Sequence, residues 1–336
     1  MVTLKDIASR CGCSVATVSK ALNGMSDISE ETTRYVRSIA SKMGYMPNAA
    51  ARTLKTNRSR TVAMLMFLRD ENVWTHDYFS RIAASVQDVM EENGYDITPI
   101  NCNRQGAVSD HLNYCRHRGY DGVIVMSLGF EEDNLHELVA SEIPLVTIDY
   151  AFSGRGAVFS DNQQGMKELT RYAFERGHRK IAFIHGEDTV VTQGRLQSFQ
   201  AAVNELNLRI EPEYLCSAFY HDPKSAAKAA MTLLNLKDRP TCIFFQDDYS
   251  CIGALDLLRR EKREFPKEIS VAGYDGIRLA ELMSPRLTTF QQNSGEIGRE
   301  AARMLLEAIE KPRNFVPRYV TLPGKLIEGE TVRPLK

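Results

Sequence analysis

Apolar residues near the N-terminus recur at the three- and four-residue spacing of short amphipathic helices. The segment LKDIASRC predicts a first helix, with Thr3 as its N-cap and Gly12 as its stop. Ser14 is placed as the N-cap of a second helix over residues 15–22, and Ser29 as the N-cap of a third. About three residues separate the first two helices, the spacing of a helix-turn-helix. We therefore predict a small all-α helix-turn-helix headpiece.

Beyond residue 60 the pattern changes to short, uninterrupted apolar strands separated by helical stretches. Continuous apolar strands are buried on both faces, which is typical of parallel sheets covered by helices. The predicted strands are 61–68, 122–127, 145–149, 180–185, 242–246 and 270–274. The length of this part favours two such α/β lobes with parallel sheets.

Charge is distributed unequally between these two parts. Residues 1–60 hold ten Lys or Arg and four acids, out of 42 and 43 in the chain, which leaves 32 basic and 39 acidic residues in the remainder. The N-terminal segment is thus +6 and the rest is −7. A basic arm on an acidic body is suited to bind the phosphates of nucleic acid.

Composition limits the class of protein further. The seven cysteines are scattered and contain no CxxC pair, so we expect reduced thiols rather than disulfides or a structural zinc site. The longest apolar run, 62–68, is too short to span a bilayer, and the N-terminus lacks a signal-peptide stretch. We expect a cytoplasmic protein with no membrane partner, no metal and no cofactor.

The predicted second helix supplies the candidate contacts to the major groove of DNA. Val15 and Ala16 can make only apolar contacts, such as those to thymine methyl groups. Lys20 can read a guanine edge or contact a phosphate, and both alternatives stay open. Thr17 can instead support the start of the helix, and Ser19 can touch phosphate. The full set of candidates is Val15, Ala16, Thr17, Ser19, Lys20 and Asn23.

A short alanine-rich segment follows the headpiece. Pro47 can begin a helix, but residues 48–55 make barely two turns, too few to be stable alone in water. Leu54 has no hydrophobic neighbour in the sequence and can wedge between base steps in the minor groove. The alternative is a plain linker. The candidate DNA contacts here are Ala51, Arg52, Leu54 and Lys55.

Polar residues follow several of the predicted strands, where ligands bind in open α/β sheets. They are Ser127, Asp149, Asp247, Asp248 and Asp275. His178, His185 and the Asp247-Asp248 pair are the strongest argument for an enzyme. No nucleophile elbow, phosphate loop or metal-ligand spacing accompanies them, so we expect binding without catalysis.

The stretches TLKDIA, SVATVSKALNG and GYMPNAAARTLK resemble, in order and spacing, the headpiece and hinge of the lactose/galactose repressor (LacI/GalR) family. VFSDN, QGRLQSF, FFQDDYSCIGAL, SVAGYDG and LTTFQQ extend the resemblance to the rest of the chain. The resemblance implies a transcription regulator that binds a palindromic operator as a homodimer, with paired Leu54 side chains kinking the DNA. It also implies an effector domain like a periplasmic sugar-binding protein, with two lobes and three crossovers.

This resemblance sets the expected domain boundaries. They are 1–46 for the headpiece, 47–59 for the hinge, 60–160 with 292–321 for the N-terminal lobe, and 161–291 with 322–336 for the C-terminal lobe.

The resemblance also implies a small-molecule effector site between the lobes. Arg195 and Asp275 are expected to hold neighbouring hydroxyl groups, since each can make two hydrogen bonds at once. Asp149 and Asp247 would add polar contacts, and Asp248 is read as an N-cap. The aromatic face is expected from Tyr78, Phe79 and Phe219, with Tyr220 an equal alternative to Phe219 and Trp74 either stacking or packing.

Departures from the family pattern favour a neutral sugar as effector. Where many members have Asn-Asp, this chain has Asp247-Asp248, which repels phosphate and carboxylate. Purine-binding members carry Arg and Thr where this chain has Thr189 and Val191, so a purine is disfavoured. The alternatives are a nucleoside or purine corepressor and a phosphorylated protein partner. We favour an inducer, although the sequence leaves the sign of the coupling open. No leucine heptad tail follows the last lobe, so we expect a dimer.

Overall fold

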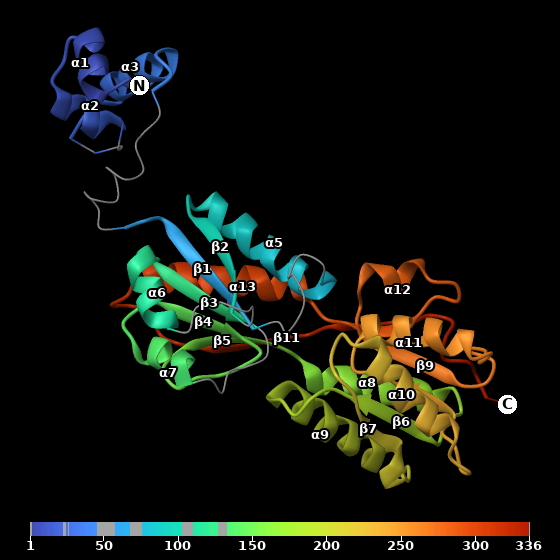
Figure 1. The fold of residues 1–336 in the computed structure, drawn as a ribbon. Coiled ribbons are helices and arrows are strands. Elements are labelled where there is room, and N and C mark those ends of the chain that lie inside the picture. Colours follow the sequence, from blue (N-terminus) through green and yellow to red (C-terminus); the bar gives the residue numbers. More distant parts are fainter. Residues whose placement is uncertain are drawn as a thin grey trace. The chain divides into compact units, whose positions relative to one another are not determined.

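The fold was examined in a computed structural model of the chain (Figure 1). The structure describes residues 2–22, 25, 27–45, 58–67, 76–102, 110–126 and 133–335. The chain separates into two compact units, Met1–Ser59 and Arg60–Lys336.

The N-terminal unit contains α1 (Leu4–Cys11), α2 (Val15–Leu22) and α3 (Glu30–Lys42). Thr3 and Asp6 form the predicted capping box, because each side chain accepts a hydrogen bond from the other's backbone N–H. Gly12 ends α1 in the left-handed conformation, at φ 67°. The Ser14 hydroxyl accepts from the Thr17 N–H at 3.0 Å and starts α2. Local capping therefore sets the boundaries of the first two helices as the sequence predicts.

One apolar cluster holds the three helices together. Its fully enclosed members come from all three helices: Ile7, Ala8, Val18, Ala21, Val36 and Ala40. This confirms the predicted three-helix headpiece.

The N-terminal lobe of the larger unit is built on a six-stranded sheet of order β11-β5-β4-β3-β1-β2, in which every pair is parallel. The strands are β1 (Thr61–Met66), β2 (Asp96–Asn101), β3 (Gly122–Met126), β4 (Leu145–Ile148), β5 (Gly156–Ser160) and β11 (Tyr319–Leu322). Helices α5 (Asp77–Glu92) and α13 (Ser294–Glu310) cover one face, and α6 (His111–Arg118) and α7 (Asp133–Ala140) the other. The inner strands β1, β3 and β4 are buried on both faces, which is why they read as continuous apolar runs, whereas the edge strands β2 and β11 are partly exposed.

The C-terminal lobe repeats this plan with the sheet order β12-β10-β9-β8-β6-β7. Its strands are β6 (Ile181–His185), β7 (Leu215–Ser217), β8 (Cys242–Phe244), β9 (Ser270–Asp275), β10 (Thr288–Gln291) and β12 (Lys325–Ile327). Helices α8 (Asn162–Glu175) and α9 (Val190–Glu205) pack on one face, and α10 (Pro223–Leu234) and α11 (Asp248–Arg260) on the other. Two short helices, η2 (Pro212–Tyr214) and α12 (Arg278–Leu282), complete the lobe. The edge strand β12 runs antiparallel to β10, unlike the parallel pairing predicted for the sheets.

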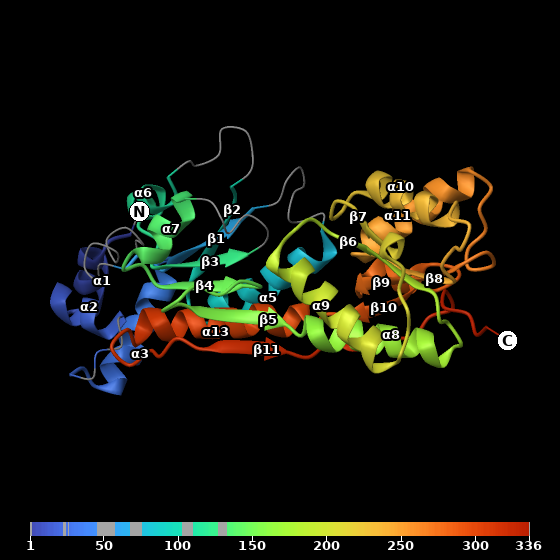
Figure 2. The same cartoon turned by 90° about the horizontal axis from the view of Figure 1, so that it is seen from below.

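The chain passes between the two lobes three times, as Figure 2 shows. The passages join β5 to α8, β10 to α13, and β11 to β12. The strand ends next to these passages therefore lie between the lobes.

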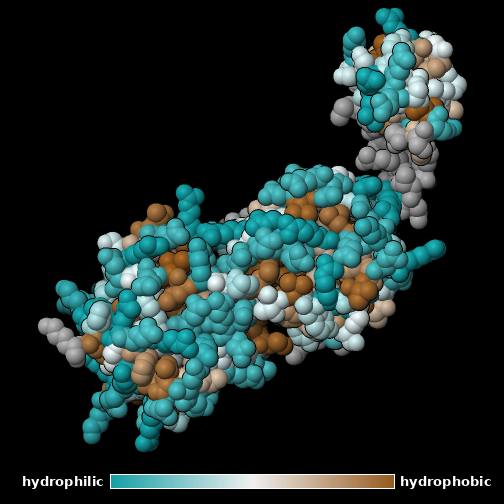
Figure 3. Space-filling model, turned by 180° about the vertical axis from the view of Figure 1, so that it is seen from behind, coloured by the Kyte–Doolittle hydropathy of each residue, from teal (hydrophilic) through white to brown (hydrophobic). Residues whose placement is uncertain are grey.

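The outer surface of the larger unit is mainly hydrophilic on the side seen in Figure 3, with small scattered apolar patches. Among the helices that the structure describes, none is long and apolar enough to cross a membrane.

Candidate functional site

Helix α2 presents one face to solvent and one to the headpiece core. Val18 and Ala21 are fully buried, whereas Val15 is 40% exposed and Ala16 and Lys20 are also exposed. Thr17 and Ser19 are half-buried, and the Thr17 hydroxyl lies 2.8 Å from that of Ser14. The predicted contacts at Val15, Ala16 and Lys20 thus lie on an accessible face, while Thr17 contributes to the start of the helix.

Lys20 already has an ionic partner in the free headpiece. Its Nζ lies 2.5 Å from Oδ2 of Asp27, and this hydrogen bond from Lys20 lowers the pKa of Asp27. Both side chains are about half exposed, at 50% and 55%, so the pair is weak and easily exchanged. Lys20 can therefore leave Asp27 for an acceptor on DNA.

The predicted contacts Asn23, Ala51, Arg52, Leu54 and Lys55 lie outside the described residues, as does Trp74.

In the larger unit, Arg195 is the centre of a buried polar cluster at the start of α9. It is 4% exposed, its Nε donates to Oδ1 of Asn162 at 2.8 Å, and Nη1 donates to the Gln246 carbonyl at 2.9 Å. Its guanidinium lies over the Tyr274 ring, 3.7 Å from the centroid. Burial alone would lower the pKa of Arg195, but Tyr220, Tyr274 and Asp275 raise it, so the group stays charged. Asn162, at the first passage between the lobes, therefore orients Arg195.

Asp275 lies beside Arg195 without bonding it directly. Its Oδ1 is 3.9 Å from Nη2 of Arg195 and accepts from Nε2 of Gln292 at 2.6 Å. Asp275 has φ 107°, an uncommon conformation for a non-glycine residue. Burial raises the pKa of Asp275 well above its ordinary range, against the lowering effect of Arg195. A separation of 3.9 Å is too long for a hydrogen bond, so each group can bind a ligand atom.

The N-terminal lobe brings Tyr78 and Asp149 to the same place. The Tyr78 hydroxyl donates to Oδ2 of Asp149 at 3.2 Å, and the Ser160 N–H donates to Oδ1 at 3.2 Å. Burial, then the charges of Asp149 and Asp275, raise the pKa of Tyr78. Asp275 is on the other lobe, so Tyr78 and Asp149 face the Arg195 cluster across the boundary between the lobes.

The N-cap of α11 is Asp247, and not Asp248 as predicted. Asp247 accepts from the Ser250 N–H at 2.6 Å, the Ser250 hydroxyl at 2.8 Å and the His221 N–H at 3.1 Å. These bonds orient Asp247 and leave acceptor capacity on its carboxylate, so the predicted effector contact stays a prediction. Asp248, predicted to cap, is fully buried and accepts from the Ile277 N–H at 2.9 Å. Burial raises the pKa of Asp248 to about 7.

Phe219 is 49% exposed, and its predicted contact with the effector stays a prediction. The next residue, Tyr220, points inward, and its hydroxyl lies 2.9 Å from that of Thr192. His221 then adopts the left-handed conformation, at φ 56°. That turn carries the imidazole of His221 toward the N-terminal lobe, where it meets Phe79 with the ring centroids 6.3 Å apart.

The sequence reasoning missed His76. This residue is 6% exposed and is the N-cap of α5, since its Nδ1 accepts from the Phe79 N–H at 3.4 Å. Its Nε2 lies 2.7 Å from Nδ1 of His221 on the other lobe. The sequence signal was a polar residue directly before an apolar helical pattern, which is where an N-cap is expected.

A hollow of about 330 Å³ opens beside this contact. It is lined by His76, Asp77, Tyr249, Asp275, Ile277, Arg278, Leu279 and Leu282, which come from both lobes. The hollow connects the candidate effector residue Asp275 to the surface between the lobes.

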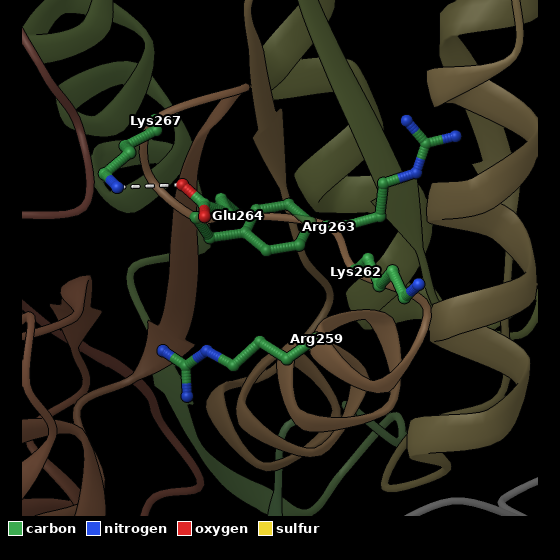
Figure 4. A pocket seen from close by; sticks show the side chains of 6 residues that line it. Arg259, Lys262, Arg263, Glu264 and Lys267 are labelled. Atoms are coloured by element: carbon green, nitrogen blue, oxygen red, sulfur yellow. Dashed lines mark hydrogen bonds and ion pairs between the residues drawn. The ribbon is translucent and has the colours of Figure 1, made fainter.

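A second hollow, of about 470 Å³, lies at the far end of α11 and is basic (Figure 4). It is lined by Arg259, Lys262, Arg263, Glu264, Phe265 and Lys267. Lys267 pairs with Glu264 at 2.8 Å and Arg263 with Glu268 at 3.4 Å. Arg259 lies in the last turn of α11 and Lys262 directly after the helix, where positive charge offsets the negative end of the helix. Local electrostatics account for this cluster without a ligand.

Comparison with known proteins matches both units. Residues 3–48 match the family described as bacterial regulatory proteins, lacI family, and residues 170–332 match the periplasmic binding protein-like domain. The chain is 31% identical over 343 residues to the HTH-type transcriptional repressor PurR of Vibrio vulnificus, with all of both chains covered. It is 29% identical over the same length to PurR of Haemophilus influenzae strain PittEE, again with full coverage of both.

Solved structures give the same result. The transcriptional regulator CelR in complex with cellobiose has a TM-score of 0.75 and 25% identity, with 98% of this chain and 100% of that chain covered. The lac repressor dimer bound to operator and the anti-inducer ONPF has a TM-score of 0.80 and 21% identity, with 99% of each chain covered.

These features define a class of protein in which a helix-turn-helix unit is joined to a two-lobed α/β binding unit. The chain belongs to the LacI family of bacterial regulatory proteins and is a DNA-binding transcriptional repressor. LacI-family repressors bind operator DNA as dimers and respond to small-molecule effectors.

Proposed function

We propose that this chain represses transcription as a homodimer on a palindromic operator and is controlled by a neutral polyhydroxylated molecule, a sugar, bound between its lobes. The observation that carries the effector class is the 3.9 Å gap between Nη2 of Arg195 and Oδ1 of Asp275. Both side chains are buried, so water does not solvate them and weaken their interaction with a ligand. A donor fork and a carboxylate at this spacing suit two neighbouring hydroxyl groups of one ligand.

A ligand at this position would touch both lobes. Arg195 and Asp275 belong to the C-terminal lobe, whereas Tyr78 and Asp149 belong to the N-terminal lobe and face them. Contacts to both lobes favour one angle between them over others, which is the differential affinity that an allosteric effector needs. A coupling of about 1–3 kcal/mol is typical of allostery and is enough to change operator occupancy substantially. We favour an inducer that releases DNA.

A purine or nucleoside corepressor is the second candidate, because relatives of full length carry the name PurR. Against it, Thr189 is the N-cap of α9, with its hydroxyl accepting from the Thr192 N–H at 3.2 Å, and is not the arginine of purine-binding members. Val191 likewise offers no hydrogen bond.

A thermal-shift panel on the full chain tests the effector class. The panel contains neutral mono- and disaccharides, sugar phosphates, nucleosides and purine bases. A ligand at 100 times its dissociation constant stabilises the protein by about 2.7 kcal/mol. We expect a neutral sugar to raise the melting temperature of the wild type and of Asp256→Asn, a surface control, but not that of Asp275→Asn.

Other outcomes contradict the sugar proposal in defined ways. A shift with hypoxanthine or guanine alone would establish the purine class. No shift with any compound, together with DNA release that requires a cell extract, would favour a phosphorylated protein partner. We also propose that the protein binds its ligand without converting it chemically. Proton NMR spectra of the ligand before and after prolonged incubation with the protein test this.

A further inference from the structure

His76 and His221 join the two lobes directly. His76 precedes α5 of the N-terminal lobe, and His221 lies between β7 and α10 of the C-terminal lobe. Nε2 of His76 is 2.7 Å from Nδ1 and 2.8 Å from Nε2 of His221, with the ring centroids 3.8 Å apart and the rings nearly perpendicular. Both side chains are largely enclosed: His76 is 6% exposed and the His221 side chain 17%.

The cap on α5 determines where His76 carries its proton. Nδ1 of His76 accepts a hydrogen bond from the Phe79 N–H, so this nitrogen has no hydrogen. A neutral His76 must then hold its proton on Nε2, which makes Nε2 the donor toward His221. This nitrogen is almost equally far from both nitrogens of the perpendicular His221 ring, so its N–H points at the face of that ring. A neutral ring accepts an N–H at its face, whereas a positively charged ring repels it. The contact between the lobes therefore requires two neutral imidazoles.

The carboxylate of Asp247 also contacts His221. Its Oδ1 lies 3.6 Å from Nδ1 of the His221 ring, and its Oδ2 accepts a hydrogen bond from the backbone N–H of His221 at 3.1 Å. A proton on His221 would make its ring a cation, which repels the Nε2–H of His76 and attracts the carboxylate of Asp247. His221 can thus pair with His76 when neutral, or with Asp247 when protonated, but not with both.

We propose that His76 and His221 form a proton-operated latch: as neutral imidazoles they hold the lobes together at this edge of the cleft, and protonation releases them. A second bond between the lobes lies directly beside the pair, since the Arg278 N–H donates to Oδ2 of Asp77 at 3.0 Å. The two contacts share the N-terminal end of α5, so they open together.

The sign of the pH dependence follows from the enclosed pair. Burial, and then the proximity of His221, lowers the pKa of His76 to about 2. The closed contact is therefore fully present above the ordinary histidine pKa of about 6.5 and is lost as the pH falls below it. Because His76 binds a proton near neutral pH only after the contact opens, the closed state is about tenfold less favoured at pH 5.5 than at pH 7.5.

Other ionisable groups surround the pair from every neighbouring element. Asp77 and Tyr78 lie on α5, where Asp77 pairs with Arg81 at 2.8 Å, and Tyr249 lies on α11 with its ring centroid 6.5 Å from that of His221. The remaining groups are Tyr220, Asp247, Asp248, Asp275 and Arg278. Two of them compete with the latch as pH sensors, because burial raises the pKa of Asp248 to about 7 and raises that of Asp275 as well.

Histidine-ring NMR of the full-length protein tests the pairing without any effector. The chain has seven histidines, and His76→Gln and His221→Gln assign the two signals. We expect the His76 ring of the wild type to titrate well below an ordinary histidine, and the pKa of His76 to rise in His221→Gln, where the neighbouring imidazole is gone. His117, exposed on α6, supplies the reference signal, and His117→Gln is the matched control. Titration of the His76 ring near pH 6.5, unchanged in His221→Gln, would overturn the latch.

Hydrogen exchange measures whether the lobes open. After correction for the intrinsic pH dependence, protection of the Arg278 amide should fall between pH 7.5 and 5.5 in the wild type and in His117→Gln. The double variant His76→Gln/His221→Gln keeps neutral donors and acceptors and removes both imidazoles, so its protection should not fall at the lower pH. Protection that does not change in the wild type contradicts the latch. Persistence of the fall in the double variant also contradicts it, and Asp248 and Asp275 cannot be its source, because burial raises their pKa and favours the closed state as the pH falls.

The consequence for effector binding rests on the proposed function. If binding needs the closed cleft, the dissociation constant of an identified sugar should rise about tenfold at pH 5.5 in the wild type, and not in the double variant His76→Gln/His221→Gln. If no sugar raises the melting temperature but His76 titrates well below an ordinary histidine, the effector class is rejected and the latch is kept. If a sugar binds but His76 titrates as an isolated histidine, the latch is rejected and the effector class is kept.

Discussion

Gly186 and Tyr220 are in contact so close that no side chain fits between them. A Cβ atom at Gly186 would lie 1.9 Å from Cε2 of the Tyr220 ring. The ring is held from its other end by the hydroxyl contact with Thr192, 2.9 Å away. The absence of a side chain at position 186 therefore lets Tyr220 reach its place beside Arg195.

Gly186→Ala is expected to displace Tyr220 and to weaken effector binding at least tenfold, about 1.4 kcal/mol. The matched control is Gly194→Ala, because a Cβ atom there meets nothing within 4 Å. Gly194 lies inside α9, so the control should gain about 0.5–1 kcal/mol of stability and bind normally. Calorimetric titration with the ligand found in the panel measures both. Equal affinities in the two variants would mean that Tyr220 does not shape the site.

Lys20→Ala tests how α2 meets DNA. If Lys20 reads a base edge, the variant should lose about 1–3 kcal/mol of discrimination at one base pair of each half-site. If it contacts phosphate, binding should weaken on all sequences and the dependence on salt should become shallower. Asp27→Asn is the companion variant, since it frees Lys20 from its ion pair. Binding to a set of operator variants at several salt concentrations separates the two outcomes.

Leu54→Ala tests the predicted wedge in the hinge. Specific operator binding should fall ten- to a hundredfold, about 1.4–2.8 kcal/mol, because the wedge is used only on kinked DNA. Binding to unrelated DNA should hardly change, since that binding depends on charge. Parallel titrations on operator and on random DNA decide the matter, and equal losses on both would contradict the wedge.

Asp248 should make the protein less stable at high pH. Burial raises the pKa of Asp248 to about 7, so the folded state holds a proton that the unfolded state has released between about pH 4 and pH 7. Stability contributed by this group therefore falls as the pH rises through that interval, by on the order of 4 kcal/mol at most. Asp248→Asn keeps an acceptor for the Ile277 N–H and removes the titration. Denaturant unfolding at pH 5 and pH 8 should show a smaller difference in the variant, and an unchanged difference would assign the titration elsewhere.

The features that the sequence predicted well are those with local causes. The capping box of Thr3 and Asp6 and the cap at Ser14 depend on residues three positions apart, and both are present. The six predicted strands are also present because burial on both faces leaves an uninterrupted apolar run. The pairing direction of β12 was not predictable, since an edge strand at the end of the chain returns after β11 with no pattern of its own.

The errors at the candidate site have tertiary causes. Asp247 and Asp248 are equally good caps in sequence, and only the position of the Ile277 N–H decides which carboxylate turns inward. The sequence left Phe219 and Tyr220 as equal alternatives, because it does not show the left-handed turn at His221 that follows them. The pair of His76 and His221 joins residues 145 positions apart, which no local pattern encodes.

The three passages of chain between the lobes restrict how the cleft can move. With one connection, the lobes could swivel freely and slide past each other. Three connections allow the lobes to rotate about a shared hinge axis and resist sliding and separation. Ligands of different size would then change a single interlobe angle by different amounts. A cut in any single passage would also leave the two lobes covalently joined.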